Sequence, residues 1–195
     1  MTPKALFSSK RNRQKGMSFI EVLVAMVILV TGILGAVAMQ ASAKKGSFDA
    51  LQRSLASSLT QDILERMRGN NATNLALYAG IYDGIEPAPA LRCNTPGALC
   101  NTPVQLKDND LFEWTQALRG GDTLNAGANA GGLIDAIGCI ALDPADPNFV
   151  TITISWQGRV SSQDGAAANN ATSQACGIDI DSDRRRQVAL QAFIF

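Results

Sequence analysis

An uncharged apolar run, Val22–Met39, constrains the fold of this chain more than any other feature. As a helix its 18 residues would be about 27 Å long, close to the roughly 30 Å thickness of a bilayer's hydrocarbon core. Residues 1–16, which come before it, hold no acid and five basic side chains, Lys4, Lys10, Arg11, Arg13 and Lys15. The positive-inside rule keeps such a flank in the cytoplasm. We therefore expect the run to span a membrane, with the rest of the chain outside the cytoplasm.

The helical pattern continues beyond this run. Apolar residues recur at spacings of three and four, which is typical of a helix with one buried stripe. They are Phe48, Leu51, Leu55, Leu59, Ile63 and Met67. Gly69 follows two cations, Arg66 and Arg68, which suit the negative end of a helix dipole. The sequence predicts one helix from about Phe19 to Arg68, roughly 75 Å long.

The remainder of the chain predicts an α+β head. After an irregular stretch, a short helix is expected over Asn109–Leu118. Strands are expected over Gly138–Leu142, Phe149–Gln157 and Arg186–Phe195, and the middle one alternates apolar with hydroxyl side chains. A small antiparallel sheet laid on the amphipathic half of the long helix would bury the apolar faces of both.

The four cysteines, Cys93, Cys100, Cys139 and Cys176, all follow the apolar run. They form no C-x-x-C pair and the chain has no histidine, which disfavours a zinc site. Outside the cytoplasm they are expected to form disulfides, for which three connectivities are possible. We favour Cys93–Cys100 with Cys139–Cys176, because the first pair would close a small loop.

A specific motif lies at the start of the apolar run. Gly16 ends the basic leader, Met17 begins a hydrophobic stretch, and Glu21 is the fifth residue of that stretch. This pattern resembles the type III signal of type IV prepilins. The resemblance implies that prepilin peptidase cleaves between Gly16 and Met17 on the cytoplasmic side and then methylates the new N-terminus.

Glu21 has a physical task in such a subunit. An uncompensated carboxylate near the centre of a bilayer costs up to about 2.5–3.5 kcal/mol. Cleavage would create a terminal ammonium on Met17, and the ammonium of a neighbouring, axially shifted subunit can lie against Glu21. At about 4 Å and an effective dielectric constant of 20, this attraction is about 4 kcal/mol before desolvation is subtracted. Glu21 is therefore expected to set the register between subunits.

The resemblance extends to the minor pilins called pilus-modification proteins (PilV). It is carried by the apolar stretch and by further segments, Glu65–Asn70, Tyr78, Leu111–Leu118, Thr151–Trp156 and Arg184–Phe195. It implies the type IV pilin fold, with a cleaved leader over 1–16, a membrane and filament-core helix over 17–43, an amphipathic half over 44–68 and a periplasmic head over 69–195. It also implies a subunit that moves from the inner membrane into the pilus. There it would help to prime assembly with other minor pilins and the major pilin, and so serve twitching motility or adhesion.

Other interpretations of the N-terminus remain open. A pseudopilin of a type II secretion system shares the signal and the architecture. A conventional secretory signal could be cut after Ala36–Ala38 or Ala41–Ala43, which would release a soluble protein. A plain single-pass anchor would leave the spacing of Gly16 and Glu21 unexplained.

Several classes of function are disfavoured. Beyond residue 16 the chain holds 12 basic and 17 acidic side chains, a net charge of −5, which argues against nucleic acid as a partner. It lacks histidine, a phosphate-binding glycine loop and a Ser–His pair, so we expect neither an enzyme nor a cofactor. Asp179–Asp183 weakly resembles a calcium loop, but Arg184 stands where that loop needs glycine. Trp114 and Trp156 are expected in the core of the head.

Overall fold

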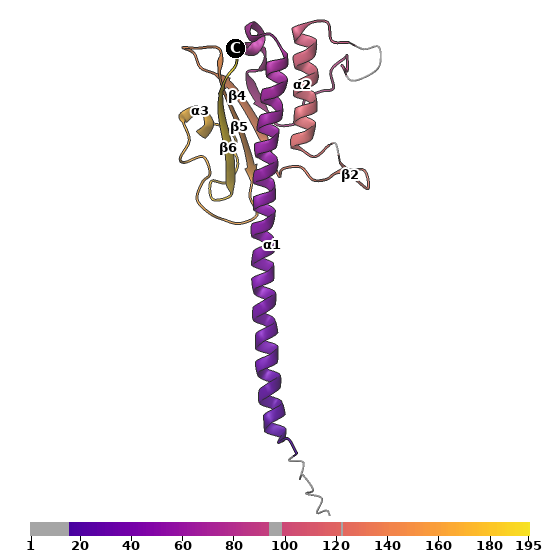
Figure 1. Ribbon diagram of the computed structural model, residues 1–195, viewed down its shortest axis with the longest axis vertical. Helices are drawn as coiled ribbons and strands as arrows, with labels where there is room; N and C mark the ends of the chain where they lie inside the picture. Colours follow the sequence, from indigo (N-terminus) through magenta and orange to yellow (C-terminus); the bar gives the residue numbers. More distant parts are fainter. Residues whose placement is uncertain (1–15, 94–98, 122) are drawn as a thin grey trace, which may run out of the picture. The chain divides into compact units, whose positions relative to one another are not determined.

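The computed structural model describes residues 16–93, 99–121 and 123–195. The chain divides into two compact units, one ending at Lys44 and one from Lys45 to Phe195. The long helix α1, Phe19–Gly69, has 51 residues and belongs to both (Figure 1). It ends one residue later than the sequence predicts. The basic residues of the leader, up to Lys15, lie outside the described residues.

The first half of α1 has no apolar partner within the described part of the chain. Its large apolar side chains, from Phe19 to Met39, are all between 45% and 79% exposed. Thr31 is the one hydroxyl within Val22–Met39, and its Oγ1 donates to the carbonyls of Val27 and Ile28 at 2.9 and 3.0 Å. This part of the helix therefore offers a uniformly apolar surface, with its single hydroxyl satisfied internally.

The second half of α1 packs on the sheet. Its buried residues are Gln52, Ala56, Leu59, Thr60, Ile63, Leu64 and Met67. The predicted stripe is confirmed at Leu59, Ile63 and Met67, but Leu51 is 68% exposed. At 3.6 residues per turn Leu51 points away from the stripe, and Gln52 occupies the sheet-facing position beside it.

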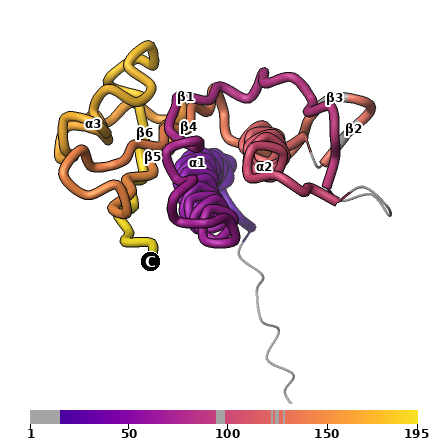
Figure 2. Tube along the Cα trace, turned by 90° about the horizontal axis from the view of Figure 1, so that it is seen from above, coloured from indigo at the N-terminus to yellow at the C-terminus, as the bar shows by residue number. Residues whose placement is uncertain are grey.

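The head, Lys45–Phe195, contains one four-stranded antiparallel sheet in the order β1-β4-β5-β6 (Figure 2). This confirms the α+β fold expected of a pilin. The elements after α1 are η1 Ala72–Tyr78, β1 Gly80–Tyr82, α2 Pro103–Leu118, β2 Leu124–Asn125, β3 Ala128–Asn129, β4 Ile137–Leu142, β5 Phe149–Gln157, α3 Ala171–Gln174 and β6 Arg185–Phe193.

Helix α2 begins at Pro103, six residues before the predicted start at Asn109, so that prediction was wrong. The reason is a capping box before the apolar part of the helix. Gln105 N donates to Thr102 Oγ1 at 3.2 Å, and Gln105 Oε1 accepts from Thr102 N at 3.3 Å. Proline at the first helical position costs nothing, because its missing N–H would have no partner in the helix.

Trp114 joins three elements of the core. Its side chain is fully buried, and Nε1 donates to the carbonyl of Leu59 in α1 at 2.9 Å. Its ring meets that of Tyr82 in β1 edge to face, with 6.0 Å between centroids. In β4, a Cβ on Gly138 would stand 2.3 Å from the indole, so glycine is needed there. Trp156 is 2% exposed, and the prediction that both tryptophans lie in the core is confirmed.

The hydroxyl-bearing face of β5 is buried as well. A covering segment, residues 158–184, lies on it and satisfies its polar groups. Thr153 Oγ1 lies 2.9 Å from Ser173 Oγ, and Ser155 Oγ donates to the carbonyl of Cys176 at 2.9 Å. Arg185 fixes this segment through Asp164, and this hydrogen bond lowers the pKa of the Asp164 carboxyl.

Both disulfides have the connectivity favoured from the sequence. Cys93 is joined to Cys100 with 5.3 Å between Cα atoms, and Cys139 to Cys176 with 6.0 Å. The first closes a surface loop before α2. The second ties β4 to the covering segment across 37 positions of the chain.

We expect the two disulfides to differ in their effect on stability. The longer loop confines the unfolded chain more, so Cys139→Ser with Cys176→Ser should lower the free energy of unfolding by about 4 kcal/mol, against about 2.5 kcal/mol for Cys93→Ser with Cys100→Ser. Urea denaturation of the detergent-solubilised full chain, followed by tryptophan fluorescence, measures both. Equal losses of stability, or a larger loss for Cys93→Ser with Cys100→Ser, would contradict the expected dependence on loop length.

Candidate processing and assembly site

Gly16 and Met17 lie just before the helix. Ser18 O accepts the first helical hydrogen bonds, from Glu21 N at 3.0 Å and Val22 N at 3.3 Å. Met17 is 75% exposed, so the bond between it and Gly16 is accessible in a non-helical segment. A Cβ on Gly16 would meet no atom of the described chain within 4 Å. Nothing inside the described structure therefore demands glycine at this position.

Glu21 lies exposed in the first turn of α1. The positive end of the helix dipole favours an acid there. Among the ion pairs of the described residues, none includes Glu21. This carboxylate therefore has no cationic side chain to neutralise it within residues 16–93, 99–121 and 123–195.

The prokaryotic N-terminal methylation motif matches residues 11–37. The chain carries the signal of type IV pilins and pseudopilins. The match includes Gly16, Met17 and Glu21, the three residues selected from the sequence. Comparisons with curated proteins and with solved structures gave no significant match.

The motif continues into a helix suited to a membrane. Helix α1 contains an 18-residue window with a mean hydropathy of 2.7, and none of that window is buried. No other helix of the described residues has both the length and the hydropathy to cross a bilayer. The motif and the helix together indicate that the chain is anchored in a membrane.

The end of α1 is connected to the head by polar contacts that the sequence did not predict. We expected Arg66 to act only as a helix-end cation. Its Nε binds Asp62 at 3.0 Å and its Nη1 binds Glu113 of α2 at 2.8 Å. Burial acts to raise the pKa of Glu113, but hydrogen bonds from Arg66, Asn109 and Arg92 outweigh it and lower the pKa. Arg66 is thus a link between two helices.

Tyr78 lies at the centre of this polar cluster. Asn70 Nδ2 donates to its hydroxyl at 3.2 Å, and the hydroxyl donates to Asp110 Oδ2 at 2.7 Å. Burial raises the pKa of both Tyr78 and Asp110. The cluster joins the end of α1, η1 and α2, so its role is to hold the head on the helix.

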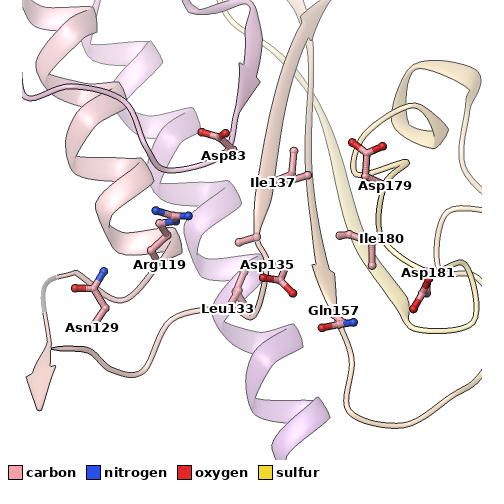
Figure 3. A pocket seen from close by; sticks show the side chains of 11 residues that line it. Asp83, Arg119, Asn129, Leu133, Asp135, Ile137, Gln157, Asp179, Ile180 and Asp181 are labelled. Atoms are coloured by element: carbon pink, nitrogen blue, oxygen red, sulfur yellow. The ribbon is translucent and has the colours of Figure 1, made fainter.

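The head also contains an open cavity of about 520 Å³ (Figure 3). Four carboxylates line it, together with Arg119; the acids are Asp83, Asp135, Asp179 and Asp181. Two of them belong to the segment that weakly resembles a calcium loop. Within the described residues, no group of three or more His, Cys, Asp or Glu side chains is arranged to hold a metal ion.

Replacement of Tyr78 by phenylalanine tests the polar cluster. Asp110 has a raised pKa in the folded chain, so its ionised form opposes folding as pH rises through that pKa. The tyrosine hydroxyl favours the ionised form. Tyr78→Phe should therefore lower the free energy of unfolding by about 1.5–3 kcal/mol near pH 7, where a hydrogen bond to a charged group is lost. The loss should be smaller near pH 4, because a hydrogen bond between neutral groups is worth only about 1 kcal/mol.

Tyr82→Phe is the matched control, since this hydroxyl donates to the carbonyl of Tyr78 at 2.7 Å and not to an acid. Its effect on stability should be about 1 kcal/mol at both pH values. Urea denaturation at the two pH values measures both variants. A pH-independent loss for Tyr78→Phe would show that Asp110 does not depend on this hydroxyl.

Proposed function

We propose that this chain is a minor pilin, processed by prepilin peptidase and incorporated into a type IV pilus. One observation carries the proposal. The methylation motif extends into a helix whose large apolar side chains from Phe19 to Met39 are all exposed. The same part of the helix bears an acid, Glu21, which no cationic side chain of the described residues pairs with. The exposed apolar half of α1, here called the stalk, needs lipid around it before assembly and the stalks of other subunits around it afterwards.

Processing follows from the exposed segment before the helix. The basic leader stays in the cytoplasm and presents the bond between Gly16 and Met17 to the peptidase at the membrane surface. Cleavage frees the amino group of Met17, which the peptidase then methylates. The packing of the described residues tolerates a side chain at Gly16, so the glycine serves the peptidase and not the fold.

Assembly uses the new ammonium and Glu21. In a bundle of axially shifted stalks, the ammonium of one subunit neutralises the carboxylate of its neighbour. The attraction is about 4 kcal/mol at about 4 Å and a dielectric constant of 20, before desolvation is subtracted. In such a bundle the apolar side chains of neighbouring helices would exclude water from Glu21, which would make a mismatched register costly.

The minor role rests on the resemblance to pilus-modification proteins. Three residues within the segments that carry this resemblance make contacts that join α1 to the head: Arg66 near the end of α1, Asn70 directly after it, and Tyr78 in η1. A few such subunits with complementary heads would lower the cost of starting a bundle. A type II secretion pseudopilin is the second candidate, because the motif is common to both classes.

The N-terminus of the mature protein is the first test. We expect membranes to contain a chain that begins at N-methylated Met17, and a peptidase-deficient strain to contain only chain that begins before Gly16. N-terminal sequencing and intact-mass measurement distinguish the two. A chain that starts at Met39 or Lys44 would instead indicate conventional signal cleavage and would overturn the proposal.

Glu21→Gln tests assembly separately from processing. It removes the charge but keeps the leader, so cleavage and methylation should continue. Incorporation into sheared pili, measured by quantitative immunoblot, should fall at least about tenfold, the equivalent of 1.4 kcal/mol. Glu65→Gln is the matched control, because Glu65 is an exposed partner of Arg68 and such pairs are worth little.

Equal incorporation of the Glu21→Gln and Glu65→Gln proteins would contradict the role of Glu21. Deletion of the chain then separates the two candidate functions. Loss of pili with normal enzyme secretion supports the pilus. The reverse outcome would identify a secretion pseudopilin.

A further inference from the structure

One margin of the sheet is open, and its backbone groups lack partners. Strand β6 is the last strand of the sheet (Figures 1 and 2). The covering segment closes only its beginning, where Gly165 N donates to the carbonyl of Arg185 at 2.9 Å. Beyond Gln187 no described residue pairs with the outer side of the strand.

Hydrogen bonds at the two ends of β6 fix which backbone groups face outward. Arg184 and Ile194 bond toward β5, the first through its carbonyl with Gly158 N and the second through its N–H with the carbonyl of Asn148. Arg185 bonds away from β5. Because N–H and C=O alternate in direction along a strand, the odd-numbered residues present theirs outward. These are Ala189, Gln191 and Phe193, and all three are exposed.

This margin lacks the features that normally protect an edge strand. Proteins commonly place Lys, Pro, inward-pointing charges or a bulge on an exposed edge. From Val188 to Phe195 the chain has no charged residue, no proline and no glycine. Phe193 is 46% exposed, and the inner-face residues Val188 and Leu190 are only partly buried. An added strand would shield the margin of β6 and satisfy three N–H and three C=O groups.

We propose that the β6 edge, Val188–Phe193, accepts an uncharged strand from the head of a different pilin-type subunit, in antiparallel pairing. The orientation of the partner rests on the proposed function, in which neighbouring stalks enter one membrane from the same side. Like heads then stand the same way up. The sheet is antiparallel throughout, so its two edge strands, β1 and β6, run in opposite directions. When two such heads have the same orientation, β6 of one head is therefore antiparallel to the strand that occupies the β1 edge of its neighbour.

A second copy of this chain is a poor occupant. Its own β1, Gly80–Tyr82, has three residues against the six open residues of β6. Antiparallel pairing of two β6 strands would turn one head upside down, and a parallel pair is the less stable ladder. The length and the direction of the open edge therefore favour a longer margin strand on another chain.

Photo-crosslinking in cells that assemble pili tests this edge in the full chain. A benzophenone amino acid replaces Gln191 at the edge, or Ala168, which is exposed on the covering segment, as the matched position. We expect a product from the edge position at least about tenfold above that from the matched position. Mass spectrometry should identify the captured chain as one with its own N-terminal methylation motif and map the link to a strand.

Ala189→Pro, combined with the benzophenone at position 191, removes one outward N–H. Proline is accepted on an edge strand when its nitrogen faces away from the ladder, so the bonds to β5 remain. The crosslink should fall about tenfold, whereas Ala189→Ser should leave it unchanged. Resistance of the Cys139–Cys176 disulfide to reduction and alkylation reports that the head is folded. If Ala189→Pro fails this check, Gln191→Lys with the benzophenone at position 189 replaces it.

The outcomes separate this inference from the proposed function. N-methylation of Met17 is measured in the same membranes and reports on pilin processing alone. Normal processing with no excess of crosslink at the edge would overturn the edge while leaving the pilin assignment intact. Capture of a second copy, or a crosslink unaffected by an edge substitution in a folded head, would overturn it as well.

Discussion

The structure depends on a difference in burial between the two halves of a single helix. The same α1 that buries Leu59, Ile63 and Met67 against a sheet leaves every large apolar side chain from Phe19 to Met39 at least 45% exposed. Apolar surface costs about 25 cal/mol per Å² when it faces water, so this half of the helix needs lipid or other helices around it. The head must therefore be stable by its own core, and the stalk must be stable through its surroundings.

Trp114 shows how the head achieves this with a small core. One indole fills the space between α1, β1 and β4, and its N–H reaches the carbonyl of Leu59. A side chain on Gly138 would exclude it. Polar contacts reinforce the same helix pair from outside, through Arg66 and Glu113, while the Cys139–Cys176 disulfide holds the covering segment on the other face of the sheet. Different contacts thus join α1 to α2 and the sheet, and the sheet to the covering segment.

Periodicity and spacing predicted what is local. They predicted the long helix, three of the four sheet strands and the buried tryptophans. Gly16, Met17 and Glu21 were selected by a resemblance to the prepilin signal, and the methylation motif covers all three. Periodicity and spacing missed the start of α2, although Thr102, Pro103 and Gln105 form a readable capping box. They also missed β1 and the burial of Thr153 and Ser155, because a three-residue strand and a distant covering loop leave no periodic signal.

Stalk and head therefore supply different kinds of information to an assembly. Between Phe19 and Met39 the helix is apolar apart from Glu21 and Thr31. In the proposed filament this surface could pack with any similar helix, and Glu21 would set the register between subunits but would not select the partner. Identity has to come from surfaces whose hydrogen bonds must be matched. In the proposed assembly the β6 edge is such a surface, because its unpaired N–H and C=O groups have to be matched by a strand and the flanking side chains set the register of that strand. Its lack of charge also keeps the cost of desolvation low, which suits a contact made beside a membrane where subunits meet at high local concentration.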